Sequence, residues 1–283
     1  MKTALLIFLL SISLLIKGQQ QTVDIIATPI LMEFKQIEKY GSGFFYLSSN
    51  TLFFVTAKHV LYNSVADSTG KLTYSLKDST VSLYYYSNNP DIEEKKELKI
   101  DLYGLSKSGN IGTANHKDIA IGRIGKLIAK DNYFGVEYNQ YTKKLGQSSS
   151  VNIILATDIV PYKNVKAGSD IYILGYPKAL GLKNKPQYDF SKPLIRKGIV
   201  AGKNNILKTI VVDCTVYPGN SGSPVFQYVN DVYKLIGIAI EFIPEVIEWK
   251  NSNYGISNYE LINSGYSVVE SIEDIEELIR YFK

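Results

Sequence analysis

Cysteine and histidine are scarce in this 283-residue chain, which has one cysteine and two histidines. With Cys214 alone, no disulfide forms within the chain, and we expect a buried structural thiol at this position. The two histidines, His59 and His116, stand in unrelated stretches and do not form the ligand cluster of a metal site. A glycine-rich loop with phosphate-binding spacing is also missing. We therefore expect neither a metal nor a cofactor.

Long runs of one charge sign are missing too. The chain has 31 lysines and arginines against 27 acidic residues, and the net charge of +4 is spread over the whole length. No basic run is interleaved with stacking aromatic residues, so nucleic acid is not an expected partner. Hydrophobic residues at 45% and charged residues at 20% are typical of a globular protein with a substantial core.

The apolar run at the N-terminus is short. It covers thirteen mostly apolar residues from Ala4 to Ile16, after Lys2 and before Lys17. A positive start and a short apolar core are typical of a secretory signal, and this run is too short for an ordinary membrane-spanning helix. We expect residues 1–18 to be a signal peptide, and the rest to be exported to the periplasm or the medium without a membrane span.

The remainder alternates short apolar runs with turn residues in two blocks. Period-two stretches such as Leu72–Leu76, Val81–Tyr86 and Asp170–Gly175 predict strands, and the looser stretch ending in Gly146–Ser150 predicts the boundary between the blocks. Many short strands punctuated by glycine and proline indicate β-barrels. The last residues differ: apolar side chains recur at helical spacing after Ser271 and predict one C-terminal helix that packs on the barrels.

A serine stands between two glycines in Tyr217-Pro-Gly-Asn-Ser221-Gly-Ser-Pro-Val-Phe226. Glycine permits the tight backbone path that exposes a serine hydroxyl. The same path turns the amides of Gly219 and Ser221 toward one point, as an oxyanion hole requires. A serine is a weak nucleophile without a base and a group that orients the base. This stretch therefore raises the question of which residues supply both.

Two further motifs answer that question. His59 ends the apolar run Leu52-Phe-Phe-Val-Thr-Ala-Lys-His59, and Asp118 precedes the alternating Ile119 and Ile121. Together with Gly41-Ser-Gly-Phe-Phe, these motifs resemble the trypsin-fold (chymotrypsin-like) serine proteases, which share the order His, Asp, Ser. The resemblance runs from about Ile30 to the C-terminus. We expect His116, two residues before Asp118, to lie in a loop at the surface.

The resemblance implies a fold and a mechanism. The fold would be two six-stranded Greek-key β-barrels, about 22–148 and about 149–270, with the active site between them and a helix at about 271–283. Residues 19–283 would then form one peptidase domain that cleaves protein or peptide substrates through an acyl-enzyme. His59, Asp118 and Ser221 would be the catalytic residues, and the backbone of Gly219 and Ser221 would form the oxyanion hole. The pattern indicates no oligomeric state.

The branch of the family and the specificity follow from departures at single positions. Asn220 replaces the aspartate that pairs with a new N-terminus in digestive relatives. The motif is instead similar to bacterial glutamyl endopeptidases and high-temperature-requirement proteases. Thr215, Ile238 and Ala239 would line the specificity pocket. Ala239 stands where the glutamyl branch has a histidine, so a preference for glutamate is not indicated. Thr215 is not acidic, so a preference for lysine or arginine is not indicated either.

Two readings of the same motifs stay open. The first is an exported serine endopeptidase. The second is a catalytically silent trypsin-fold protein with a binding or regulatory role, whose triad is present but not productively arranged. The geometry of the oxyanion hole and the access to the cleft separate the two.

Overall fold

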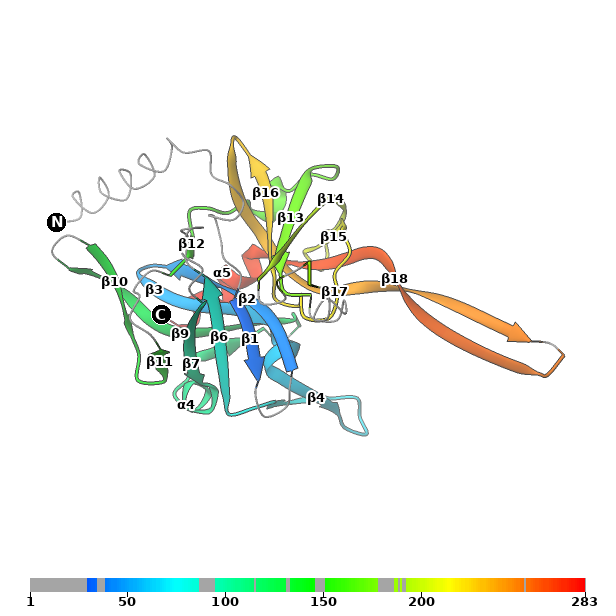
Figure 1. Cartoon of the computed structure of the whole chain (residues 1–283), viewed down its shortest axis with the longest axis horizontal. Helices are drawn as coiled ribbons and strands as arrows, with labels where there is room; N and C mark the ends of the chain where they lie inside the picture. The colour runs from blue at the N-terminus through cyan, green and yellow to red at the C-terminus, as the bar shows by residue number, and fades with distance from the viewer. Residues whose placement is uncertain are drawn as a thin grey trace.

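The protein is described by a computed structural model (Figure 1). The structure describes residues 30–34, 39–86, 95–114, 116–130, 133–145, 151–177, 186–187, 189, 192–251 and 253–282. The predicted signal peptide at residues 1–18 and the predicted boundary at Gly146–Ser150 lie outside the described residues.

In the described residues, the first half of the chain forms a curled ten-stranded sheet with the order β10-β9-β3-β2-β1-β6-β7-β11, while β12 pairs with β2 and β8 pairs with β9. A separate ribbon, β4–β5, and two short helices, α3 and α4, complete this half. The bounds are β1 Ile30–Phe34, β2 Lys39–Ser48, β3 Thr51–Ala57, α3 Lys58–Leu61, β4 Tyr62–Ala66, β5 Leu72–Leu76, β6 Thr80–Tyr86, β7 Lys95–Asp101, α4 Leu102–Lys107, β8 Ile111–Thr113, β9 Ile119–Lys130, β10 Tyr133–Tyr138, β11 Thr142–Leu145 and β12 Ile153–Leu155.

The second half closes into a barrel with the strand order β13-β14-β15-β18-β17-β16. Its bounds are η2 Tyr162–Asn164, β13 Asp170–Gly175, β14 Leu194–Asn204, β15 Thr209–Asp213, β16 Pro224–Val229, β17 Val232–Asn251, β18 Ile256–Ser271 and the C-terminal helix α5 Ile272–Arg280. The predicted all-β fold of two barrels with a C-terminal helix is confirmed. The strand β12, which follows the predicted boundary, still pairs with β2 of the first half.

Two hairpins show how local sequence fixes the strand register. Ser49 and Asn50 join β2 to β3, and Asn230 and Asp231 join β16 to β17; all four have positive φ angles. Two-residue loops with both φ angles positive match the right-handed twist of the flanking strands. The β2–β3 turn sets the register of β3, the strand that leads to His59.

The main hydrophobic core joins the two halves. It contains Phe44 and Phe54 from the first half, Phe226 and Ile238 from the second, and the apolar face of α5. Helix α5 begins after Ser271, whose hydroxyl accepts a hydrogen bond from the Glu273 amide at 3.0 Å and so satisfies one free donor of the first turn. Of the apolar residues that recur at helical spacing, Ile272, Ile275, Leu278 and Ile279 are buried, and Phe282, which follows the helix, is half-buried. The helix therefore packs on the body of the protein, as its sequence pattern predicts.

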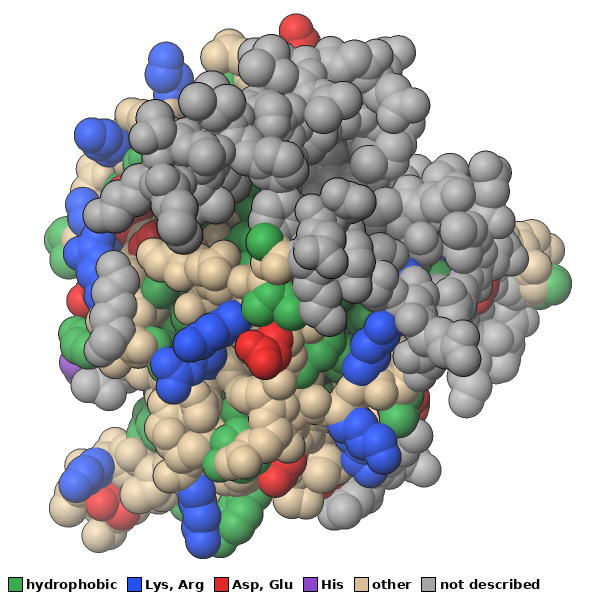
Figure 2. All heavy atoms as spheres, turned by 90° about the vertical axis from the view of Figure 1, so that its left-hand side faces the viewer, with side chains coloured by type: hydrophobic (Ala, Val, Ile, Leu, Met, Phe, Trp, Pro, Cys, Tyr) green, Lys and Arg blue, Asp and Glu red, His purple; other side chains and the backbone are tan. Residues whose placement is uncertain are grey.

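One segment leaves the compact body. The outer parts of β17 and β18 continue as a two-stranded hairpin in which Val246 pairs with Leu261 and Asn251 pairs with Ile256. Figure 1 shows this hairpin projecting far from the second barrel. On the face shown in Figure 2, the coloured lysine and arginine side chains are scattered rather than gathered in one patch.

Candidate active site

Strand pairing brings His59 and Asp118 together. His59 lies in α3, the single turn that follows β3, and Asp118 directly precedes β9. Strands β3 and β9 are antiparallel, and Ala57 pairs with Ile119. The ladder continues one step further, because the Lys58 amide donates to the Asp118 carbonyl oxygen at 3.1 Å. Two residues 59 positions apart therefore meet at the end of a strand pair.

The Asp118 carboxylate contacts His59 with both oxygens. Oδ1 accepts a hydrogen bond from the His59 backbone amide at 2.8 Å, and Oδ2 contacts Nδ1 of the imidazole. A carboxylate only accepts, so the proton of a neutral imidazole lies on Nδ1 and Nε2 is left as the acceptor. His59 is exposed, so its ring is open to solvent. The arrangement leaves Nε2 free to accept a proton, as a general base requires.

The serine lies in two consecutive turns. The Asn220 amide donates to the Tyr217 carbonyl oxygen, and the Ser223 amide donates to that of Asn220, both at 2.9 Å. Gly219 and Gly222 occupy the third position of each turn with φ angles of +100° and +90°. Pro218 and Ser221 precede them without positive φ, which is typical of type II turns. The glycines thus place Ser221, which is half-buried, at the corner between the two turns.

Gly222 also brings this loop against the first half of the chain. A Cβ atom on Gly222 would lie 2.1 Å from the Ser42 carbonyl oxygen and 2.4 Å from Thr56 Oγ1. The Ser42 amide donates to the Ser221 carbonyl oxygen at 2.9 Å. Since Thr56 is three residues before His59, the serine loop and the His59 turn lie side by side. Position 222 therefore requires glycine for two reasons: a Cβ atom would clash with Ser42 and Thr56, and the φ angle is positive.

The Ser221 hydroxyl donates a hydrogen bond to the Ile240 carbonyl oxygen at 3.0 Å. Within the described residues, no hydrogen bond joins it to His59. A rotation about χ1, which moves a side chain between staggered rotamers, redirects this hydroxyl. Catalytic hydrogen bonds in structures without substrate are often long or poorly aligned and tighten when substrate binds. In this structure the Ser221 hydroxyl is thus hydrogen-bonded to the main chain of β17.

The two amides predicted for the oxyanion hole are open. No described residue accepts a hydrogen bond from the backbone N–H of Gly219 or Ser221. The next peptide unit, between Gly219 and Asn220, is held in place, because the Gly219 carbonyl oxygen accepts from Ser42 Oγ at 2.7 Å. Ser42 Oγ in turn accepts from the Tyr176 amide at 3.0 Å. Ser42, in β2 of the first half, thereby joins two segments of the second half, the serine loop and the residue after β13; its short Gly-Ser-Gly motif does not reveal this role.

Two lysines surround the His59 turn. Lys77 Nζ donates to the His59 carbonyl oxygen, and the Lys77 amide donates to the Leu61 carbonyl oxygen at 2.8 Å. Burial and the neighbouring Lys39 lower the pKa of Lys77, while Asp118 opposes this shift. Lys58 is buried; its Nζ donates to the Ala114 carbonyl oxygen at 3.1 Å and lies 3.6 Å from the centre of the Tyr74 ring. Sequence reasoning missed both contacts, because the partners are distant in the chain.

The residues predicted for the specificity pocket lie near the serine loop. Thr215 is half-buried two residues before Tyr217. Ile238 and Ala239 are buried in β17, and the Ala239 backbone accepts from the Gly222 amide at 2.8 Å and donates to the Ser223 carbonyl oxygen at 2.9 Å. Ala239 therefore holds the loop through its main chain. Contact of these three side chains with substrate stays a prediction.

The remaining reactive groups stand apart from this site. Cys214 is buried, and burial raises the pKa of its thiol, which disfavours the thiolate. His116 is exposed in the loop that precedes Asp118. Across the described ranges, no group of three or more His, Cys, Asp or Glu side chains is arranged to hold a metal ion. No helix in that part of the chain is both long and apolar enough to cross a membrane.

Comparison with known proteins gives a family and a fold. Residues 41–238 match the model of the trypsin-like peptidase domain family. No curated protein matches the chain. A thermostable serine protease, AL20, from an extremophilic microorganism is similar in structure, with 12% identity and a TM-score of 0.50 over 92% of this chain and 97% of AL20.

Two longer proteins are also similar in structure. The serine endoprotease from Yersinia pestis has 15% identity and a TM-score of 0.47 over 92% of this chain and 65% of its own. The HtrA-type protease AlgW, solved with a tripeptide, has 13% identity and a TM-score of 0.48 over 92% of this chain and 60% of its own. The chain thus spans less than two thirds of the length of either protein.

Proposed function

This chain belongs to the trypsin-like peptidase domain family, and we propose that it is an exported serine endopeptidase that cleaves peptide bonds through His59, Asp118 and Ser221. The observation that carries the proposal is the contact of both Asp118 oxygens with His59, beside a serine loop whose Gly219 and Ser221 amides are open. Base, orienting carboxylate, nucleophile and oxyanion donors are the parts that acyl transfer requires.

The first chemical step uses these groups in a fixed order. The Ser221 hydroxyl leaves the Ile240 carbonyl oxygen and turns to Nε2 of His59, which takes its proton as Oγ attacks the carbonyl carbon of the peptide bond. The carbonyl oxygen becomes an oxyanion, which accepts from the Gly219 and Ser221 amides. Asp118 stabilises the imidazolium that forms. Loss of one oxyanion donor typically costs on the order of 100- to 1,000-fold in rate.

The later steps return the enzyme to its starting state. The C–N bond breaks as the imidazolium gives its proton to the leaving amine, and an ester on Ser221 Oγ remains. Water, deprotonated by His59, attacks this ester, and the acid product leaves while Ser221 recovers its proton. The chain's own residues carry every proton transfer in this sequence.

Export is the second part of the proposal. Its support is the N-terminal pattern of Lys2, an apolar core from Ala4 to Ile16, and Lys17. Expression of the full chain in a bacterium should yield a protein outside the cytoplasm whose intact mass corresponds to a start near residue 19. A chain that keeps Met1 and stays in the cytoplasm would contradict export and leave the peptidase proposal standing.

Cleavage of a peptide library by the full chain, followed by mass spectrometry, tests the activity. We expect internal cleavage of peptides by the wild-type protein and none by Ser221→Ala. Cleavage by Ser221→Ala at the wild-type rate would assign the activity to another site or to a contaminant. The products also identify the side chain preferred before the cleaved bond.

A catalytically silent binding or regulatory protein is the second candidate, favoured by one observation. Ser221 donates to the Ile240 carbonyl oxygen rather than to His59. In this case a folded wild-type protein would bind peptides without cleaving them, and binding would be unchanged in Ser221→Ala. Turnover by the wild-type protein excludes this candidate.

A further inference from the structure

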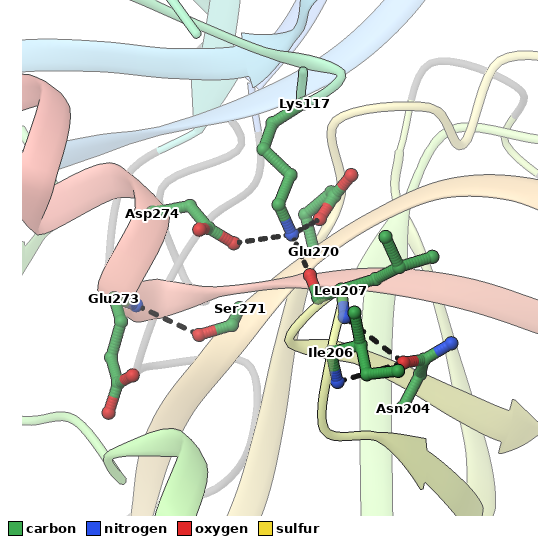
Figure 3. Close-up of polar contacts among 8 residues, drawn as sticks. All are labelled: Lys117, Asn204, Ile206, Leu207, Glu270, Ser271, Glu273 and Asp274. Atoms are coloured by element: carbon green, nitrogen blue, oxygen red, sulfur yellow. Dashed lines mark hydrogen bonds and ion pairs between the residues drawn. The ribbon is translucent and has the colours of Figure 1, made fainter.

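A buried ionic cluster is centred on the residue before Asp118. Lys117, the residue next to Asp118, places Nζ 2.7 Å from Glu270 Oε2 and 3.2 Å from Asp274 Oδ2. Figure 3 shows the ammonium group between the two carboxylates. Only 18% of the Lys117 side chain, 6% of Glu270 and 13% of Asp274 is exposed. A group of charges this well buried is costly unless its members pair with one another.

The partners of Lys117 come from three separate elements of the second half. Glu270 lies near the end of β18, and Asp274 lies in the first turn of α5. The third partner is the Leu207 carbonyl oxygen in the turn between β14 and β15, which accepts from Lys117 Nζ. The ammonium group therefore donates hydrogen bonds to Glu270 and Leu207 and forms an ion pair with Asp274, so its contacts hold the side chain from three directions.

Each acceptor is itself held in place. The Ile206 and Leu207 amides donate to Asn204 Oδ1 at 3.0 Å, which fixes the turn that presents the Leu207 carbonyl oxygen. The Ser271 hydroxyl caps α5 and so fixes the turn that presents Asp274 (Figure 3). Glu270 is held by the sheet, where it pairs with Thr209 on one side and Ile238 on the other. The three acceptors around Lys117 are thus each held in the second half by hydrogen bonds or by strand pairing.

Asp118 belongs to the opposite half of the chain. Its carbonyl oxygen accepts from Lys58 and its carboxylate contacts His59, so both of its known contacts lie on the β3–α3 side. Burial raises the pKa of Glu270, and both Lys117 and the backbone N–H of Asp118 oppose the rise. The Asp118 peptide is therefore close to the Glu270 carboxylate as well as bonded to the anchored Lys117.

We propose that the Lys117–Glu270–Asp274 cluster positions Asp118, and through it His59, relative to the second half of the chain that carries Ser221. Lys117 and Glu270 are positioning residues and touch neither substrate nor the reacting atoms. The inference rests on the proposed function, because it gives Asp118 the role of orienting the catalytic base. Small displacements of such a group have large effects, with about 1 Å costing about 100-fold in rate.

Lys117→Met is the main test variant, since it removes the ammonium group and keeps an unbranched side chain. We expect kcat for a peptide substrate to fall roughly 10- to 100-fold with KM unchanged. Lys117→Arg keeps the cation and should restore most of the loss. Lys197→Met is the matched control, because it removes an exposed pair in which Lys197 Nζ lies 2.7 Å from Asp170 Oδ2. It should leave kcat unchanged.

A readout without substrate separates this inference from the proposed function. The His59 Nδ1 proton, held against the Asp118 carboxylate, should give a low-field proton NMR resonance in the full chain. We expect the resonance in wild type and Lys197→Met, and its loss or displacement in Lys117→Met. If wild type has the resonance but cleaves nothing, the proposed function fails and the resonances still test the positioning.

Two results would overturn the inference. One is a folded Lys117→Met with wild-type kcat and an unchanged resonance, which would leave the cluster with a role in stability alone. The other is an equal loss of kcat in Lys117→Met and Lys117→Arg. If Lys117→Met does not fold, Glu270→Gln replaces it, since the amide has nearly the same shape without the charge. The same two readouts then decide, with loss of kcat and of the resonance expected.

Discussion

At the scale of single residues, the site depends on a few atoms that hold an exposed histidine. One oxygen of Asp118 accepts from the His59 backbone amide, and the other contacts Nδ1 of the imidazole. The His59 carbonyl oxygen accepts from Lys77. The imidazole is therefore held at Nδ1 and the His59 main chain at its amide and carbonyl, while the far edge of the ring stays open. This combination of a held base and free access is what a general base needs.

Asp118→Asn tests the orienting role. The amide keeps the shape of the carboxylate but can present an N–H to Nδ1, which favours the wrong tautomer of His59. We expect kcat to fall by about 1,000- to 10,000-fold with little change in the midpoint of unfolding. Asp231→Asn, in the exposed turn of the β16–β17 hairpin, is the control and should be active. Full activity in Asp118→Asn would contradict the role given to Asp118.

Gly222→Ala tests the close approach of the serine loop to Ser42 and Thr56. The added Cβ would meet the Ser42 carbonyl oxygen at 2.1 Å, at a φ angle of +90°. We expect a loss of at least about 2 kcal/mol in the free energy of unfolding and loss of cleavage. In Gly202→Ala the new Cβ meets no atom within 4 Å, so urea unfolding should match the wild type. Equal midpoints for the two variants would show that the loop is not constrained at Gly222.

Sequence patterns single out these three candidate residues but not the residues that hold them in place. His59, Asp118 and Ser221 carry local signatures: a small-residue turn, a strand start and a glycine-flanked serine. Ser42, Lys77 and Ile240 act through contacts with residues more than fifteen positions away. Such contacts follow from strand pairing and packing, which no local pattern encodes.

At the scale of elements, the Asp118 loop, β18 and α5 meet at Lys117. Burial raises the pKa of both Glu270 and Asp274; Lys117 opposes both shifts, and Glu277 adds to the shift at Asp274. A carboxyl group whose folded pKa is raised contributes stability below its unfolded pKa and loses it as pH rises through the folded pKa. The charge of Lys117 limits this loss in the wild-type protein.

Lys117→Met should therefore destabilise the fold in a pH-dependent manner. Without the ammonium group both carboxyl pKa values rise further, so the variant loses stability relative to wild type as pH rises from about 4. We expect a deficit of about 3 kcal/mol at neutral pH and a much smaller one near pH 4. Urea unfolding of both proteins at a series of pH values measures it. A deficit that is constant with pH would show that the carboxyl groups do not interact with Lys117.

The elements themselves were largely predictable from the sequence. β5 and β13 have the predicted bounds, and α5 buries its apolar face. β13 and α5 each pack one side on a core, whereas β5 is mostly exposed and pairs with β4. The extension of β17 and β18 was missed because both of its faces are exposed, which leaves no alternating burial pattern.

At the scale of the whole molecule, two joined barrels form the body and one hairpin leaves it. Trp249, the single tryptophan of the chain, lies on the projecting hairpin with 61% of its surface exposed. Its fluorescence should therefore resemble that of solvated tryptophan in the native protein and shift little on unfolding in urea, while far-UV circular dichroism reports the full transition. A strongly blue-shifted native emission would show that the hairpin is covered in solution.

The fold of the whole chain followed from the resemblance of three short motifs to the trypsin-fold proteases. The barrel that closes from β13 to β18 and the family match at residues 41–238 agree with it. The arrangement of extra strands around the first barrel did not follow, because β8, β10, β11 and β12 are short and pair at edges set by the tertiary structure.

Labelling of the folded full chain with a fluorophosphonate probe, read by intact mass and peptide mapping, tests the central claim most directly. The claim is that Ser221 is activated by His59 and held beside open oxyanion donors. It predicts one adduct per chain, located on Ser221 and absent in Ser221→Ala. A folded wild-type protein that gains no adduct between neutral and mildly alkaline pH, or gains one at another residue, would contradict it.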